Sequence, residues 1–387
     1  MQVILFDDQE TWKQLLPLTF TRPVSHIRIG ILTIREKWER YLNTSCYVHC
    51  QTYLNPSELE KFKGNVVILI NSNVCPDERL VAAIKELKDD EILLKGSQII
   101  AYKKAFTGEV KHESLKPVAY TEHLLDVSHP WDIFTKNAEA ILNDFNLITV
   151  GRKSEPLSPS VTVIGNPDLV FLEKGAKAEA CILNTKSGPI YLGVDAEIME
   201  GSVVRGPLAL CEHSALKLST KVYGATTVGP HSKVGGELNN SVIFGYSNKA
   251  HDGFLGNSVI GEWCNLGADT NNSNLKNNYA NVKVYNYSAG KALDSGLQFC
   301  GLIMGDHSKS GINTMFNTGT VVGVACNIYG GGFPPTHIPS FSWGGSEGFS
   351  EYQPEKLFET ASKMFERRNL TFGELEKNLL MHLYNSR

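Results

Sequence analysis

Hydrophobic residues recur at every sixth position through the middle of the chain. At positions 192, 198, 204, 210, 216, 222, 228 and 234 the residues are Leu, Ile, Val, Leu, Leu, Val, Val and Val. Because 42% of all residues are hydrophobic, eight such residues in one register arise by chance in roughly one case in a thousand. The register returns at Ile260 and Leu266 and again at positions 304 to 328, where only Ser310 is polar. This period predicts a repeat architecture.

The positions four residues further along the repeat are mostly small. From position 196 to 238 they read Ala, Ser, Leu, Ser, Thr, Thr, Ser and Leu. A period of six fits a three-sided prism, in which each face takes one short strand and one turn, with an aliphatic residue inside and a small residue beside the corner. Stacked coils pair as parallel strands about 4.8 Å apart. We therefore predict a left-handed parallel β-helix over residues 156–346.

The first 155 residues show a different pattern, in which strands alternate with helices. Residues 3–6 and 66–70 are typical of strands, and residues 34–42 are typical of a helix. Prolines open two further helical stretches, over residues 76–87 and 130–142. These elements predict an α/β domain over residues 1–155, which a Pro-rich linker joins to the β-helix.

After Gly345 the period of six ends and helical spacing returns. Leu357, Met364 and Phe365 line a first helix, and leucines between 375 and 383 line a second. We predict that residues 347–387 form a helical cap over the open last coil.

Composition narrows the classes of partner. The chain has 387 residues, 37 of them basic and 41 acidic, for a net charge of −4, and it has no long run of Lys or Arg. Such a chain does not attract nucleic acid or an anionic membrane, and a small-molecule substrate is favoured. We expect a cytoplasmic protein, because no leader pattern or membrane-spanning segment is evident. The eight scattered cysteines are interpreted as reduced thiols.

The six-residue register breaks twice, and we expect chemistry at such breaks. The first break, residues 238–255, contains Asn248, Lys249, Ala250 and His251. The second, residues 271–295, is polar and rich in Asn, which suits an external loop that reaches a neighbouring prism.

Stretches around these breaks resemble a known family. Residues 223–230, 248–251 and 261–270 are similar to the acetyltransferase half of the bifunctional GlmU family. That family acetylates glucosamine 1-phosphate with acetyl-CoA and then couples the product to UTP. The resemblance covers about residues 160–345. It implies amino-sugar metabolism for the cell envelope, and a homotrimer in which acetyl-CoA lies between two prisms.

The resemblance also implies roles for individual residues. His251 matches the catalytic histidine and would be the general base, since an imidazole accepts protons near neutral pH. Asn265 would contact the sugar or position its amine, and Lys249 would bind the 1-phosphate. Phe254 replaces a tyrosine that binds the sugar phosphate in the family. Asn271 is a further substrate-binding candidate.

Later coils would hold acetyl-CoA, largely through backbone groups. On this resemblance the acetyl-CoA-binding candidates are Asp306, His307, Thr314 and Thr320. The corner histidines His213 and His231 are interpreted as structural.

The amino-terminal domain departs from the family. There a Gly-rich loop after the first strand cradles a triphosphate, whereas this chain continues with Asp7 and Asp8 and has no glycine before Gly30. It resembles a divergent nucleotidyltransferase-like domain found fused to such β-helices. The candidate nucleotide-binding residues are Arg22, Arg28 and Lys37, and the candidate Mg²⁺ ligands are Asp7 and Asp8.

Three alternatives remain open beside uridylyl and acetyl transfer to glucosamine 1-phosphate. In the first alternative, the β-helix acetylates another nucleotide-linked sugar, and the first domain binds a nucleotide without catalysing a reaction. The β-helix would alternatively be a non-catalytic scaffold that binds sugar nucleotides. A γ-carbonic-anhydrase-like metal enzyme is disfavoured, because it needs converging histidines and none follows His251 before His307.

Overall fold

A computed structural model of the chain describes residues 2–54 and 57–387, and these residues form two compact units. The first unit comprises Met1–Leu15, Arg22–Ile27 and Leu32–His129, and the second comprises Leu16–Thr21, Arg28–Ile31 and Pro130–Arg387. Met1, where the predicted first domain begins, lies outside the described residues. The helix predicted at residues 130–142, which we placed in the first domain, lies in the second unit.

The first unit is built on a mixed sheet with the strand order β2–β1–β3–β5–β4–β6. Strands β1, β2 and β3 run parallel, β5 is antiparallel to both β3 and β4, and β4 is parallel to β6. The predicted strands at residues 3–6 and 66–70 are confirmed. The strands are β1 (Val3–Phe6), β2 (Cys46–His49), β3 (Val66–Asn71), β4 (Glu91–Lys95), β5 (Gln98–Ala105) and β6 (Lys116–Ala119).

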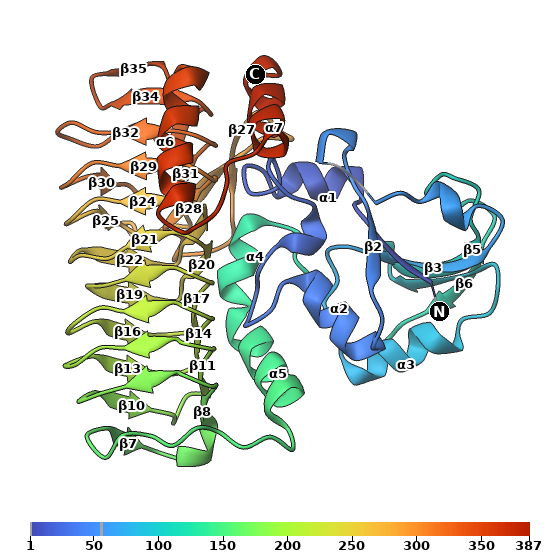
Figure 1. Ribbon diagram of the computed structural model, residues 1–387. Helices are drawn as coiled ribbons and strands as arrows, with labels where there is room; N and C mark the ends of the chain where they lie inside the picture. The colour runs from blue at the N-terminus through green and yellow to red at the C-terminus, as the bar shows by residue number, and fades with distance from the viewer. Residues whose placement is uncertain (1, 55–56) are drawn as a thin grey trace. The chain divides into compact units, whose positions relative to one another are not determined.

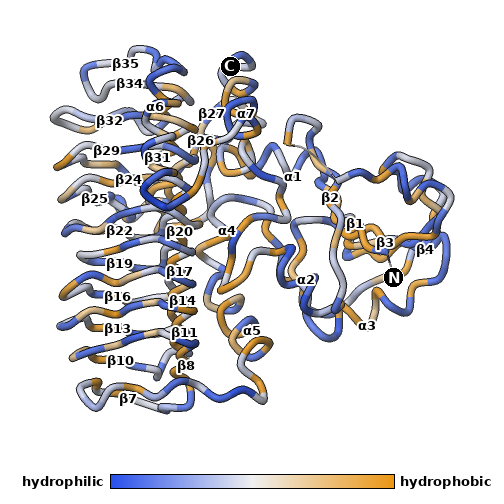
Figure 2. The backbone as a smooth tube through the Cα atoms, in the orientation of Figure 1, coloured by the Kyte–Doolittle hydropathy of each residue, from blue (hydrophilic) through white to orange (hydrophobic). Residues whose placement is uncertain are grey.

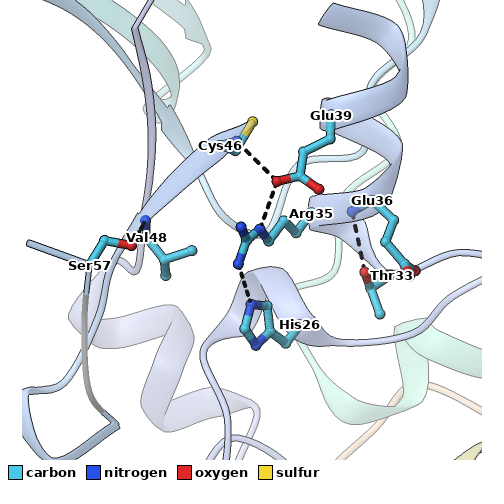
Figure 3. A network of polar contacts seen from close by, with 8 residues as sticks. All are labelled: His26, Thr33, Arg35, Glu36, Glu39, Cys46, Val48 and Ser57. Atoms are coloured by element: carbon cyan, nitrogen blue, oxygen red, sulfur yellow. Dashed lines mark hydrogen bonds and ion pairs between the residues drawn. The ribbon is translucent and has the colours of Figure 1, made fainter. Parts of the chain in front are cut away.

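The helices of the first unit begin at side-chain caps. Asp8 caps α1 (Gln9–Gln14) and Asp77 caps α3 (Glu78–Glu86). Thr33 and Glu36 form a capping box at the start of α2 (Ile34–Leu42), which confirms the predicted helix. Figure 3 shows this box and the polar contacts beside it, in which Glu39 Oε1 accepts from both Arg35 Nε and the backbone N–H of Cys46. These contacts fix α2 against β2.

The second unit contains the predicted parallel β-helix, which stacks regularly from β7 to β35 (Figure 1). Within the described residues it has three faces, named here by their first strands. The β7 face consists of β7 (Thr162–Ile164), β10 (Ile182–Asn184), β13 (Val203–Arg205), β16 (Lys221–Tyr223), β19 (Glu237–Asn239) and β22 (Phe254–Gly256). The β8 face consists of β8 (Val170–Leu172), β11 (Ile190–Leu192), β14 (Leu208–Leu210), β17 (Thr226–Val228), β20 (Val242–Gly245), β23 (Val259–Glu262), β28 (Leu302–Met304), β31 (Thr320–Val322) and β33 (His337–Ile338).

The β9 face is the one on which the candidate site lies. Its strands are β9 (Lys177–Ala178), β12 (Glu197–Ile198), β15 (Ala215–Leu216), β18 (Lys233–Val234), β21 (Asn248–Lys249), β24 (Asn265–Leu266), β29 (Lys309–Ser310), β32 (Asn327–Ile328), β34 (Ser342–Gly345) and β35 (Gly348–Glu351). Neighbouring strands on this face pair in parallel, except that β35 folds back antiparallel on β34.

The predicted inward register is confirmed. The eight hydrophobic residues from Leu192 to Val234 are at most 2% exposed and pack into one core along the prism. Coils that contain 18 residues keep the register, so Leu210 pairs with Val228. The next coil is shorter, and Val228 pairs with Ile243. This change in coil length is the physical cause of the first break in the sequence period.

The outer side of the β8 face is covered by helices of the same unit, α4 (Pro130–Thr135) and α5 (Asn137–Thr149). Hydrophobic residues are concentrated on the strands of this face (Figure 2). We predicted one helix here, but the structure has two, with a break at Lys136. The side chain of the buried Asn137 accepts a hydrogen bond from Gly30 N and donates to Ala225 O and Thr227 Oγ1. Asn137, the first residue of α5, thus joins the helix to the loop at Gly30 and to the β8 face.

The Asn-rich segment differs from the expected external loop. It starts with β25 (Asn271–Asn272), which pairs with β30 (Met315–Phe316), and continues as a hairpin of β26 (Lys283–Asn286) and β27 (Lys291–Asp294). Val282 and Val284 are almost fully buried, and β26 contacts β31 of the same β-helix. The hairpin therefore packs on its own prism.

Helices α6 (Pro354–Glu366) and α7 (Glu374–Asn385) form the C-terminal end. Tyr384 of α7 packs edge-on against Phe341 of the last coil, as expected of a cap. In contrast, α6 runs back along the β9 face, where Phe365 contacts Trp263. Among the described residues, no helix is both long and apolar enough to cross a membrane. All eight cysteines are buried thiols.

Candidate active site

Aromatic and histidine side chains form a column along one corner of the β-helix. Each lies at a left-handed turn, with φ between 51° and 60°. Neighbouring rings in the column are nearly parallel, with centroids 4.3 to 6.4 Å apart. The members, in order along the prism, are His213, His231, Tyr246, Trp263 and His307. Tyr246 and Trp263 of this corner column form one wall of a pocket on the β9 face.

A row of polar residues beside the corner column forms the floor of the pocket. Lys233, Asn248, Asn265 and Lys309 are directly paired across β18, β21, β24 and β29. Adjacent members of such a row are about 4.8 Å apart, because each belongs to the next coil. Their partners on the same strands, such as Val234 and Leu266, point into the prism and are buried.

Helix α6 forms the roof of the pocket. Its buried positions Leu357, Ala361 and Phe365 are spaced four residues apart, so they lie on one side of the helix. Phe365 stacks on Trp263, with 3.9 Å between ring centroids and 17° between ring planes. This contact fixes α6 so that Thr360 and Met364, and the arginines that follow the helix, line the pocket.

The pocket enclosed by floor, column and roof has a volume of about 640 Å³. A volume of this size suits a substrate or cofactor fragment. In the described part of the chain it is lined by no Asp or Glu, and its lining includes Lys233, Lys309, Arg367, Arg368 and His251. The pocket is therefore basic.

The two residues on which the predicted acetyl transfer most depends both line this pocket. His251 is exposed and lies three residues after Asn248, at the rim, while Asn265 lies on the adjacent strand β24. Among the described residues no hydrogen bond is made by the His251 imidazole, so both ring nitrogens remain accessible to a ligand.

Lys249, predicted to bind a phosphate, occupies an inward position instead. It pairs with Val234, is 2% exposed, and directs its Nζ to the carbonyl oxygens of His251 (2.5 Å) and Asp252 (2.9 Å). Burial lowers the pKa of the Lys249 ammonium to about 8. In this arrangement the ammonium fixes the turn that carries His251.

Two other substrate-binding candidates lie away from the pocket. Phe254 belongs to β22 on the β7 face. The side chain of Asn271 accepts a hydrogen bond from the backbone N–H of Phe254 (2.8 Å) and donates one to the carbonyl oxygen of Asp269 (2.9 Å). Asn271 therefore connects successive coils.

The acetyl-CoA-binding candidates have side chains engaged within the β-helix. Asp306 accepts hydrogen bonds from Glu262 N (2.9 Å) and Thr21 Oγ1 (2.7 Å). Thr314 and Thr320 donate to backbone carbonyl groups of their own coils, and His307 belongs to the corner column. Contacts from these coils to a ligand would have to come from backbone groups or from Lys309 and Ile312, which line the pocket.

Two cations of the pocket are electrostatically strained. Burial lowers the pKa of Lys309 to about 8, and its Nζ donates to the carbonyl oxygen of His307 (2.9 Å). Burial, together with the neighbouring Arg367, lowers the pKa of Arg368. Each cation is therefore less stable than in water, and an anion in the pocket would compensate for that cost.

In the first unit, Asp7 and Asp8 have different partners at the carboxyl end of β1. Asp8 Oδ2 accepts from Thr11 N as the cap of α1, whereas Asp7 Oδ2 accepts from Val24 N (3.1 Å). Burial raises the pKa of Asp7 to about 7, and the Val24 N–H and the nearby Ser72 partly offset this. Within the described residues, no group of His, Cys, Asp or Glu is arranged to hold a metal ion.

Unsatisfied polar atoms surround Asp7. Among the described residues, buried atoms without a well-formed hydrogen bond include Asp7 Oδ1, Ser25 Oγ, His49 Nδ1, Ser72 Oγ and Asn73 Oδ1. Asp7 follows β1, His49 ends β2, and Ser72 and Asn73 follow β3. These strand ends are neighbours, since Phe6 pairs with both His49 and Asn71. The carboxyl ends of parallel strands are the usual place for ligands in such sheets.

The predicted nucleotide-binding residues are divided between the units. Arg22 and Lys37 belong to the first unit and are buried. Arg28 belongs to the second, where its guanidinium donates to the carbonyl oxygen of Ile31 and approaches Cys211 Sγ at 3.8 Å.

Several pocket residues were not singled out from the sequence. A signal for the column and floor was present, because aromatic, small and polar residues recur together in Tyr246-Ser247-Asn248 and Trp263-Cys264-Asn265. No signal pointed to Arg367 and Arg368, because the sequence of an amphipathic helix does not reveal the surface on which the helix and the turn after it pack.

Residues 3–153 match a family model described as sugar nucleotidyl transferase. A bifunctional sugar-1-phosphate nucleotidylyltransferase/acetyltransferase of Sulfurisphaera tokodaii is 28% identical over 224 residues, which are 57% of this chain and 48% of that protein. The bifunctional protein GlmU of Methanocaldococcus jannaschii is 31% identical over 219 residues, 57% of this chain and 47% of that protein. The chain thus spans about half the length of the curated relatives it matches.

Two solved structures are also similar. The polysialic-acid-specific acetyltransferase NeuO is 12% identical, with 50% of this chain and 87% of that chain covered and a TM-score of 0.24. The UDP-N-acetylglucosamine acyltransferase of Arabidopsis is 15% identical, with 59% and 92% covered and a TM-score of 0.22. The β-helix assignment rests on the strand pairing described above.

Proposed function

We propose that this chain, which belongs to a GlmU-like family, transfers the acetyl group of acetyl-CoA to the amine of glucosamine 1-phosphate in the pocket beside His251. One observation carries the proposal. The exposed imidazole of His251 and the amide of Asn265, on adjacent coils, both line one basic pocket on the β9 face. A general base and a polar group that orients the amine are what this reaction needs.

In the proposed reaction His251 accepts a proton from the sugar amine as the nitrogen attacks the thioester carbonyl carbon. The C–N bond forms, the C–S bond breaks, and the proton passes from the imidazolium to the leaving thiolate of CoA. Asn265 holds the amine, and Lys249 keeps the His251 turn in place through its two backbone hydrogen bonds. Acetyl-CoA is a cytoplasmic metabolite, so we expect the reaction in the cytoplasm.

We also propose that the active protein is a homotrimer, with acetyl-CoA between neighbouring prisms. This assembly is what the resemblance of residues 223–230, 248–251 and 261–270 to the GlmU family implies. Sedimentation of the purified chain tests it, and a monomer that retains full acetyl transfer would contradict it.

The decisive experiment follows CoA thiol release from acetyl-CoA and glucosamine 1-phosphate. His251→Asn should lower kcat by about 10²- to 10⁴-fold, as loss of a general base does. His382→Asn is the matched control, because His382 is exposed on α7 and does not line the pocket. If the wild-type protein releases thiol only with another amino sugar, the substrate is that sugar. If His251→Asn keeps full activity, the proposed base is wrong.

A second activity, uridylyl transfer from UTP to the acetylated product, is favoured by the family match of residues 3–153. Mg²⁺ commonly binds one or two protein carboxylates together with substrate phosphates. Asp7 fits such a ligand because its Oδ1 is unsatisfied among the described residues, whereas Asp8 serves as a helix cap. The bound ion would neutralise the leaving pyrophosphate.

Pyrophosphate release from UTP and N-acetylglucosamine 1-phosphate, with and without Mg²⁺, tests this activity. Binding of UTP without release would support a first domain that binds nucleotide and performs no chemistry. Release that Asp7→Asn abolishes would support transfer.

A further inference from the structure

The roof of the pocket carries two adjacent arginines. Thr360 and Met364, four residues apart on α6, line the pocket, and Arg367 at the C-cap and Arg368 in the turn after it continue this lining. Within the described residues, neither arginine forms an ion pair with a carboxylate. Arg368 makes one long hydrogen bond, from its guanidinium to Asn248 Oδ1 at 3.5 Å.

The floor supplies further cations below these arginines. Lys309 is partly buried, and one of its three N–H donors reaches the carbonyl oxygen of His307. Lys233 lies three strands away on the same row. Four cations thus surround a pocket whose lining, among the described residues, contains no carboxylate.

The position of this basic cluster is fixed by packing. Phe365, which precedes the arginine pair, stacks on the buried ring of Trp263 and lies parallel to His307 at 6.4 Å. Surface lysines and arginines are commonly solvated and interact weakly. Here Lys309 and Arg368 are partly buried beside the same pocket, and Arg367 lies next to Arg368, an arrangement that a bound anion would stabilise.

We propose that Arg367 and Arg368, in the turn that ends α6, bind the phosphate group of a ligand in this pocket together with Lys309 of the floor. Guanidinium groups are suited to phosphate because their parallel N–H donors match two phosphate oxygens. The inference rests on the proposed function for the identity of the ligand, which is either the sugar 1-phosphate or the phosphates of CoA. The positive charge of the pocket suits the phosphate of either ligand.

The proposal assigns a binding role to the C-terminal end of α6. The floor alone supplies two cations, Lys233 and Lys309. The two arginines are brought to the site by the packing of α6. The helix therefore acts as a fixed, basic roof that selects phosphorylated ligands over neutral ones.

Calorimetric titration of the full chain with glucosamine 1-phosphate, glucosamine, CoA and pantetheine tests the proposal. We expect the phosphorylated member of one pair to bind and its neutral counterpart to bind at least about tenfold more weakly, with the difference reduced at high salt. Arg367→Gln and Arg368→Gln should each weaken that phosphate-dependent binding about tenfold or more. Arg368→Lys should restore part of it.

Lys356→Gln is the matched control, because Lys356 is exposed on α6 and does not line the pocket. A loss confined to glucosamine 1-phosphate identifies the acceptor phosphate, and a loss confined to CoA identifies the donor phosphates. Equal binding of phosphorylated and neutral ligands, or arginine variants that bind as well as Lys356→Gln, would overturn the proposal. Phosphate-dependent binding by a protein that releases no CoA thiol would refute the acetyl transfer alone.

Discussion

The ammonium group of Lys249 donates a hydrogen bond to the carbonyl oxygen of His251 (2.5 Å) from inside the β-helix. A second bond reaches the carbonyl oxygen of Asp252 (2.9 Å). A lysine at an inward position of a hydrophobic prism is costly, and burial lowers its pKa to about 8. The two carbonyl groups belong to the turn that carries the proposed base. Lys249 is therefore a positioning residue for His251.

Lys249→Met tests this relationship. The variant removes both Nζ hydrogen bonds, although the carbonyl oxygen of Asp252 still accepts from Asp269 N, so we expect the free energy of unfolding to fall by about 1 to 3 kcal/mol. We also expect kcat for acetyl transfer to fall more than the affinity for substrate changes, because the turn loses its fixed geometry. Lys177→Met is the control, since Lys177 is exposed on β9 of the same face. Equal kcat in the two variants would show that Lys249 has no role beyond packing.

The close approach of successive coils is tested at Gly229. A Cβ atom there would overlap the carbonyl oxygen of Phe244 on the next coil. That coil cannot move away without loss of strand pairing. We expect Gly229→Ala to lower the free energy of unfolding by about 3 kcal/mol or more, as overpacking of a core does. Gly331→Ala is matched to it, because that Cβ would meet open space and needs no left-handed backbone. Thermal unfolding followed by circular dichroism should separate the two, and similar midpoints would contradict the stacking.

Buried thiols predict how stability depends on alkaline pH. Burial raises the pKa of Cys300 and of Cys326 to about 12, whereas an unfolded thiol ionises near 9. Between these values the native state keeps protons that the unfolded state has lost. The stabilisation is therefore complete below pH 9 and decreases as pH rises toward 12, by about 1.4 kcal/mol per pH unit for each thiol.

Cys300→Ala removes one such thiol. Among the described residues this thiol makes no side-chain hydrogen bond, so none is lost. Urea unfolding between pH 9 and 11 should give a shallower decline for the variant than for the wild type, while the difference between them stays constant from pH 6 to 8. An identical slope in both proteins would mean that Cys300 ionises normally in the native state.

The parts of the fold that could be predicted from the sequence are those that repeat from coil to coil. Residues such as Leu192 and Val222 could be placed inside the prism because identical coils impose the same inward position each time. Lys249 could not, because the coil before it is shorter, which shifts an inward position onto a lysine that the six-residue register does not mark. The role of Arg367 and Arg368 could not be predicted either. It depends on the packing of Phe365 on Trp263, two residues that lie far apart in the sequence. His251 and Asn265 were identified through resemblance and meet in one pocket.

The adjacent residues Asp7 and Asp8 should respond to mutation in opposite directions. Burial raises the pKa of Asp7 to about 7 from an ordinary value near 4. Between these values the native state holds a proton that the unfolded state has released, so stability falls as pH rises from 4 to 7. Asp7→Asn removes this penalty and keeps an acceptor for Val24 N. We expect it to raise the free energy of unfolding at pH 8, on the order of a few kcal/mol, and to leave stability at pH 4 nearly unchanged.

Asp8→Ala removes the cap of α1 and should instead destabilise the protein by about 0.5 to 2 kcal/mol at pH 8. Chemical unfolding of both variants at pH 4 and pH 8 measures these effects, and destabilisation by Asp7→Asn at pH 8 would show that the native carboxylate is favourably bound. A costly buried carboxyl persists where function needs it. If Asp7→Asn is more stable than the wild type and also loses Mg²⁺-dependent pyrophosphate release, Asp7 is retained for catalysis. If the stabilised variant keeps that release, the metal ligand must be sought elsewhere in the first unit.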